Sequence, residues 1–214
     1  RPMLAAEGLA LPRSTLGAGV SLVWNYAKLR LRGVEALAVE PPPARFVRRS
    51  DLCWSLGMGL TNVMPIEGML FAVHGLLAAL ASGEPTRIGR GLAVFGAFHR
   101  LLGDAASSTT YLRRAREIAE HRGDTALLGI VHISSAADAM LSGAWHDVLS
   151  RTRTGLAALA PRGAGMTWEH VIGACFELTA LDQIGQLATV ERRASEHLRD
   201  AEARGDLYGL VVFS

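Results

Sequence analysis

Hydrophobic positions in residues 85–204 follow two alternating patterns. In one set of segments nearly every position is apolar, and the set comprises residues 85–102, 124–142 and 166–184. In the other set a single apolar stripe faces a charged side, and the set comprises residues 104–122, 144–160 and 186–204. Stripes with spacings of three and four predict amphipathic helices, and helices that are apolar all round are typical of a core. We therefore expect buried helices that alternate with helices packed over them.

Seven glycines divide this region at a nearly constant interval. Their spacing is 20 residues, with one interval of 22, and they are Gly83, Gly103, Gly123, Gly143, Gly165, Gly185 and Gly205. Glycine often follows the last turn of a helix, because it adopts the left-handed conformation without a Cβ penalty. A helix of about 16 residues plus a short connection fills such an interval. The pattern predicts an all-α fold, a right-handed stack of antiparallel helix hairpins that forms an α-solenoid with a repeat of about 40 residues.

The N-terminal segment, which precedes the glycine-spaced region, is predicted to form a single amphipathic helix. Ser14 is the expected N-cap of a helix that runs to about Arg32. Its apolar residues share one face, and they are Leu16, Val20, Val23, Trp24, Ala27 and Leu31. Its last turn carries three positive charges, Lys28, Arg30 and Arg32. An amphipathic helix of this kind fits a membrane surface. Docking against another part of a parent protein is the preferred interpretation.

Three consecutive prolines, at 41–43, predict a stiff extended linker. We therefore predict an N-terminal helix and Pro-rich linker in residues 1–43 and a helical-repeat domain in residues 44–214. Within that domain a helix is expected from about residue 45 to 60, and another from Pro65 to about Ser82. The chain begins without Met and stops inside an apolar run. We expect it to be a fragment truncated at both ends.

Charge and cysteine content narrow the class of protein. The net charge of +2 predicts no nucleic-acid partner, although residues 1–50 alone carry eight Lys/Arg and three Asp/Glu. Cys53 and Cys175 lie far apart in apolar segments, which predicts buried reduced thiols and a cytoplasmic location. The apolar run 66–80 contains Glu67 and His74, and we expect a buried helix there and no membrane span.

Motifs for catalysis and cofactor binding are not found in the sequence. There is no P-loop, no glycine-rich dinucleotide loop after a strand, and no His or Cys pair at metal-ligand spacing. We expect no enzyme activity, no cofactor and no metal in this chain. The pairs His146-Asp147 and Glu169-His170 are interpreted as solvated side chains. Trp145 and Trp168 follow spaced glycines closely and are predicted to pack between helices.

Arg-Gly-Asp occurs twice, at 122–124 and 204–206. A cell-adhesion role is the less favoured interpretation. The glycine is expected to end one helix, and the aspartate to cap the next.

Arginines recur in the middle of the charged helices. Arg113 and Arg153 both lie ten positions after a spaced glycine, and Arg151 and Arg193 both lie eight positions after one. Stacked repeats would align some of these guanidinium groups, which suit an acidic or phosphorylated peptide. These four arginines are the predicted partner-binding residues, and an ordinary charged helix face is the alternative.

Several stretches of the chain together resemble a known family region. They are Pro43-Ala-Arg45, Asp51-Leu-Cys-Trp-Ser55, Asn62-Val-Met-Pro65, Leu80-Ala-Ser-Gly-Glu-Pro85, Ser142-Gly-Ala-Trp145, Thr167-Trp-Glu169 and Glu202-Ala-Arg-Gly-Asp-Leu-Tyr208. Across residues 40–214 the chain resembles the tetratricopeptide-like C-terminal region of large bacterial proteins in which a serine/threonine kinase domain precedes an AAA-type ATPase domain. Its repeat period of about 40 departs from the usual 34.

The resemblance implies a non-catalytic protein-interaction and regulatory module of a bacterial signalling protein. Its partners would be an acidic protein or peptide and the parent's own kinase and ATPase domains. The alternatives are the repeat arm of an ATP-dependent transcriptional regulator that senses a small-molecule inducer, and a stand-alone all-α enzyme.

Overall fold

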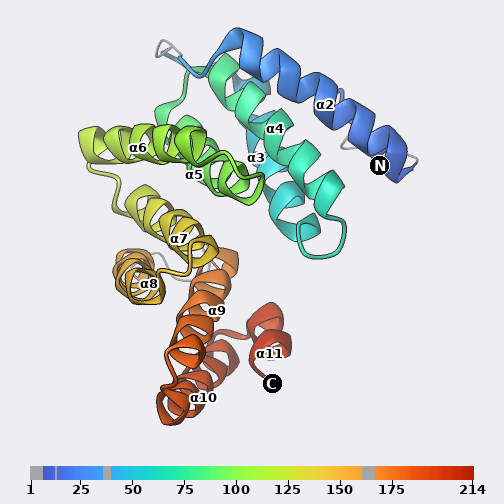
Figure 1. Cartoon of the computed structure of the whole chain (residues 1–214). Coiled ribbons are helices and arrows are strands. Elements are labelled where there is room, and N and C mark those ends of the chain that lie inside the picture. The colour runs from blue at the N-terminus through green and yellow to red at the C-terminus, as the bar shows by residue number, and fades with distance from the viewer. Residues whose placement is uncertain (1–6, 13, 36–39, 161–166) are drawn as a thin grey trace. The chain divides into compact units, whose positions relative to one another are not determined.

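A computed structural model of the 214-residue chain describes residues 7–12, 14–35, 40–160 and 167–214 (Figure 1). These residues contain ten α-helices and no strand, so the fold is all-α, as predicted. The helices are α2 (Thr15–Arg32), α3 (Ala44–Leu60), α4 (Pro65–Ser82), α5 (Pro85–Leu101), α6 (Ala105–Arg122), α7 (Thr125–Leu141), α8 (Trp145–Leu159), α9 (Thr167–Gln183), α10 (Leu187–Arg204) and α11 (Leu207–Phe213). The ends of α2 to α10 agree with the predicted segments within about two residues, whereas no range was predicted for α11.

The chain divides into two compact units, Arg1–Phe95 (unit 1) and Gly96–Ser214 (unit 2). The division falls within α5. It does not coincide with the predicted boundary at residue 43, because α2 packs against α4 and so belongs to unit 1 (Figure 1).

Helix α4 forms the centre of unit 1. It packs against both α2 and α3, and its fully buried side chains include Leu70, Phe71 and Leu76. By length and composition it is the one helix among the described residues that is apolar enough to cross a membrane, and just over half of it is buried. Burial on this scale confirms the predicted buried helix.

Unit 2 is built from helices that follow one another in the chain. Helices α7 and α8 cross closely at Gly129 and Gly155, where a Cβ on Gly155 would lie 3.0 Å from the carbonyl oxygen of Gly129. Helix α9 packs on both α7 and α8, and α10 and α11 both pack on α9. Trp145 packs against the apolar cluster of α7, α8 and α9, which confirms its predicted role.

The spaced glycines end helices as predicted. Six of the seven adopt positive φ angles, from 61° to 82°, and Gly165 lies outside the described residues. In both Arg-Gly-Asp copies the aspartate caps the next helix, because Asp124 accepts a hydrogen bond from the amide of Leu127 and Asp206 accepts one from that of Gly209. The interpretation of both copies as helix junctions is confirmed.

Both cysteines are free thiols. Cys53 is fully buried against Leu9 and Phe71, and burial raises the pKa of its thiol to about 12. Cys175 is only partly buried, so the predicted burial is complete at Cys53 alone.

Candidate functional site

The four predicted arginines do not share one environment. Arg153 of α8 and Arg193 of α10 both reach the carboxylate of Glu177 on α9. Arg113 pairs with Glu117 on its own helix, and Arg151 lies 3.8 Å from Asp147 on its own helix. The structure therefore brings two of the four together and leaves the other two in local pairs.

Glu177 is surrounded by hydrogen-bond donors. Its side chain is 1% exposed, and its Oε2 accepts a 2.7 Å hydrogen bond from Nη2 of Arg193. Nε of Arg153 lies 3.3 Å from Oε1, and Nε2 of His197 lies 3.2 Å from Oε2. Burial alone would raise the pKa of Glu177, but the hydrogen bonds from His197, Arg193 and Arg153 outweigh it and lower the pKa to about 2. The carboxylate is thus charged at neutral pH.

The cluster extends from α8 to α11. Arg193 also donates a 2.6 Å hydrogen bond to Glu196, and the ring of His197 stacks on Phe213 with 5.4 Å between the ring centroids. Four consecutive helices are thus connected through one carboxylate and its donors. A carboxylate with this many donors is suited to holding helices in register, and poorly suited to moving protons.

The predicted arginines differ in the fraction of the side chain that is exposed to a possible partner. The side chain of Arg193 is 28% exposed, whereas those of Arg113 and Arg153 are 63% and 57% exposed. Exposed ion pairs contribute little to stability, so Arg113 can exchange its present carboxylate for that of a partner, whereas Arg153 is one of the donors to the buried Glu177. Arg193 is held by the buried Glu177 and exposes less of its side chain to a partner.

Unit 1 holds a second carboxylate with two arginines. Asp51 of α3 accepts hydrogen bonds of 2.6 and 3.0 Å from Arg87 and Arg90 of α5. The guanidinium of Arg90 also lies 4.3 Å from the ring centroid of Trp54. Trp54, Arg87 and Arg90 border a cavity of about 20 Å³ that also contacts Cys53. This volume has room for about one water molecule.

Sequence reasoning missed both carboxylates. Glu177 lies among apolar residues in the middle of α9, and an acid in such surroundings is the signal that points to a buried ion pair. Glu169, in the same helix, was predicted to be solvated, and that prediction is wrong because the residue is only 5% exposed. His146 and Asp147 are exposed, as predicted.

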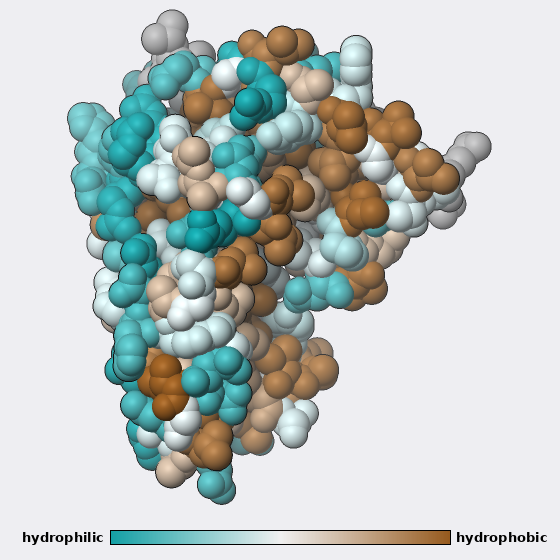
Figure 2. All heavy atoms as spheres, viewed as in Figure 1, coloured by the Kyte–Doolittle hydropathy of each residue, from teal (hydrophilic) through white to brown (hydrophobic). Residues whose placement is uncertain are grey.

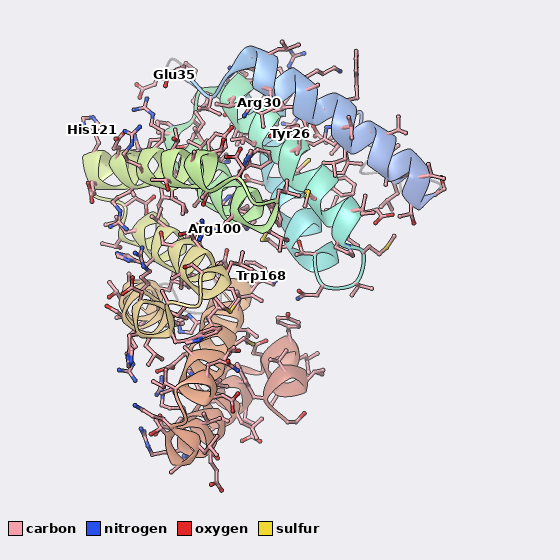
Figure 3. The ribbon with its side chains drawn as sticks, in the orientation of Figure 1. Tyr26, Arg30, Glu35, Arg100, His121 and Trp168 are labelled. Carbon is pink, nitrogen blue, oxygen red and sulfur yellow. The ribbon has the colours of Figure 1, made fainter. Side chains whose placement is uncertain are left out.

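Trp168 lies on α9 (Figure 3), where its indole nitrogen is buried without a hydrogen-bond partner in the described part of the chain. Its side chain is partly buried, in keeping with a packing role. No group of three or more His, Cys, Asp or Glu side chains comes together as a metal site within residues 7–12, 14–35, 40–160 and 167–214.

Comparison with known proteins adds no relative: no family model, no curated protein and no solved structure matches this chain.

Proposed function

We propose that this chain is a non-catalytic helical-repeat module that binds proteins and regulates the domains attached to it. The observation that carries this proposal is the repeated junction in which a helix ends at a left-handed glycine every 20 residues or so. In unit 2 each of the helices from α7 to α11 packs on the next one, and α9 also packs on α7 and α11. Contacts between successive and alternate helices are the pattern expected of a tetratricopeptide-like α-solenoid, a right-handed stack of antiparallel hairpins.

Arginines on the charged helices of unit 2 are the proposed contact points for an acidic partner. Arg113, Arg151 and Arg153 are at least 40% exposed; Arg113 and Arg151 pair only within their own helices, and Arg153 reaches Glu177 through one nitrogen. Their fork of donors matches a carboxylate or phosphate group in bidentate geometry. Arg193 supports this surface indirectly by fixing α10 against Glu177.

The parent protein would be a cytoplasmic bacterial signalling protein of the kinase–ATPase type. Binding of a partner to the repeats would shift the attached domains, which would carry the chemistry. The sequence of the full-length gene tests this part. A kinase catalytic loop and a P-loop upstream would support the assignment, and their absence would overturn it.

A small-molecule inducer is the less favoured ligand. The cavity beside Trp54, Arg87 and Arg90 measures about 20 Å³, whereas sites for drug-sized ligands measure roughly 300–1,000 Å³. A partner that lies along a surface suits unit 2 better than a ligand that enters a cavity.

Binding of a fluorescein-labelled glutamate-rich peptide, followed by anisotropy, tests the arginine surface. Charge reversal of Arg113 and Arg151 together should weaken binding by about tenfold or more, because two attractive contacts become repulsive. Arg45→Glu with Arg48→Glu on the exposed surface of unit 1 is the matched control and should bind like the unaltered chain. Equal binding by the unit 2 variant and the control would overturn the proposed surface.

A further inference from the structure

Helix α2 turns its apolar face away from the rest of unit 1. Its buried residues are Ala18, Asn25 and Leu29, and these lie on the side that packs against α4. The opposite side carries large apolar residues that are 63–90% exposed, namely Leu16, Val20, Val23, Trp24 and Leu31. Figure 2 shows hydrophobic surface along the course of α2. The sequence groups these residues on one face correctly, and the structure shows that nothing in the described chain covers that face.

Basic residues flank this apolar face on both sides. At 3.6 residues per turn, Arg30 falls beside Val23 at one edge and Lys28 falls beside Trp24 at the other. The Lys28 ammonium lies 5.2 Å from the ring centroid of Trp24. Arg32 points back and donates a hydrogen bond to the carbonyl of Leu80. The helix contains no acidic residue, so its exposed face presents apolar and positive groups only.

The charge of unit 1 has the same sign. Residues 1–95 contain ten Lys/Arg and six Asp/Glu, a net charge of +4. Among the six acids, Glu7 pairs with Arg48, Glu84 pairs with Arg87, and Glu67 is buried. An occupant of the α2 face must therefore supply negative charge as well as an apolar phase.

A second copy of the chain does not meet this requirement. It would present another α2 without a carboxylate, and the Lys28 and Arg30 side chains of the two copies would face positive charge. An anionic bilayer meets it on both edges at once, because headgroups surround an interfacial helix on each side. Lysine and arginine extend toward headgroups while apolar side chains enter the acyl boundary, and tryptophan prefers that boundary.

We propose that α2 binds the surface of an anionic membrane, with Leu16, Val20, Val23, Trp24 and Leu31 inserted and with Lys28 and Arg30 on the headgroups. The helix lies in the plane of the membrane and remains packed on α4 through Ala18 and Leu29. This role is independent of the proposed peptide surface of unit 2. It would place the module, and whatever is attached to it, at a membrane without a spanning segment.

Co-sedimentation of the 214-residue chain with lipid vesicles tests the proposal. Vesicles of phosphatidylcholine mixed with phosphatidylglycerol should bind the chain, and vesicles of phosphatidylcholine alone should bind it much more weakly. The double change Val20→Ser and Trp24→Ser should reduce binding by about tenfold or more, because two large apolar side chains no longer enter the lipid. Leu207→Ser with Val211→Ser on α11 is the matched control, since these residues are 77% and 78% exposed.

Two further variants test the charged residues of α2. Lys28→Gln and Arg30→Gln should each reduce binding to the anionic vesicles by about fivefold. Arg192→Gln in unit 2, at a side chain that is 60% exposed, removes one charge in the same way and should leave binding nearly unchanged. Far-ultraviolet circular dichroism checks that each variant keeps its helices.

A spectroscopic variant separates insertion from folding. The unaltered chain should show a blue shift of tryptophan emission when anionic vesicles are added, and Trp24→Phe should bind equally while it loses that shift. Failure of the unaltered chain to bind anionic vesicles would overturn the proposal and favour an acidic protein helix as the occupant. Binding that persists in the α2 variants would overturn it as well.

Discussion

Asp51 in unit 1 and Glu177 in unit 2 are both carboxylates paired with arginines, but they differ in how deeply they are buried. Each carboxylate receives hydrogen bonds from two arginines on other helices. The side chain of Asp51 is 43% exposed, whereas that of Glu177 is 1% exposed. Burial opposes ionisation in both cases, and the arginines still lower both pKa values, that of Glu177 to about 2. The extra donor at Glu177 is His197.

The comparison shows how burial determines the strength of an ion pair and its freedom to rearrange. Around Asp51, water and salt compete with the arginines, so the pair stabilises little and can rearrange. Around Glu177, a lost donor would leave a charge without solvent to replace it. The first cluster suits an adaptable surface, and the second suits a fixed connection between helices.

The largest effect is expected for Glu177→Gln. The change should lower the free energy of unfolding of unit 2 by about 2–4 kcal/mol, because the glutamine amide group faces the arginine donors and the charge is lost. The value lies toward the lower end of the range for buried pairs, since Arg153 and Arg193 reach water. Urea unfolding followed by circular dichroism measures it, with the exposed Glu202→Gln as control. A loss no larger than the control's would contradict the view that Glu177 connects the helices.

Acid should affect the two units in different pH windows. The folded-state pKa of Glu177, about 2, lies below its ordinary value of 4.5, so its contribution to stability is complete above about pH 4.5 and is lost as the pH falls toward 2. Burial lowers the pKa of His74 in unit 1 from 6.5 to about 4, and its contribution is lost as the pH falls from 6.5 toward 4. Glu177→Gln should flatten the first dependence and His74→Gln the second, as measured by urea midpoints across pH. If neither variant changes the pH dependence of stability in its own pH range, Glu177 and His74 are not the groups responsible for that dependence.

A smaller effect is expected for Asp51→Asn. Because the carboxylate is nearly half exposed, the loss should be at most about 1 kcal/mol and should shrink further in high salt. Arg113→Gln, which removes a wholly local pair, should give no measurable change. If Asp51→Asn lowered the stability as much as Glu177→Gln, burial of the carboxylate would not be what determines the size of the loss.

Sequence reasoning predicted the all-α class and the ends of most helices, because the signal for a helix end is local. A glycine that must adopt positive φ ends its helix regardless of distant contacts, and the aspartate after Gly123 or Gly205 caps the next helix through its own backbone. The candidate site depends on contacts that are not local. Arg153 and Arg193 meet at Glu177 across 24 and 16 positions, and spacing from a glycine does not report such convergence.

The α2 face shows a related limit. Periodicity identifies which residues share a side of a helix, and it does not say which side packs. In α2 the small Ala18 permits close approach to α4, so the helix packs through its less apolar side. The outward position of Trp24 therefore emerges only from the three-dimensional structure.

The two Arg-Gly-Asp junctions bear on how the gene can change length. Asp124 and Asp206 are separated by 82 positions that contain the four helices α7 to α10. Recombination that joined Gly123 directly to Asp206 would remove these four helices and recreate the same tripeptide, with no foreign residue at the seam. Helix α11 would then begin after the same cap that now begins α7. Duplication between the same points would lengthen the protein by the same block, so descendants of this gene are expected to differ in size by whole sets of helices.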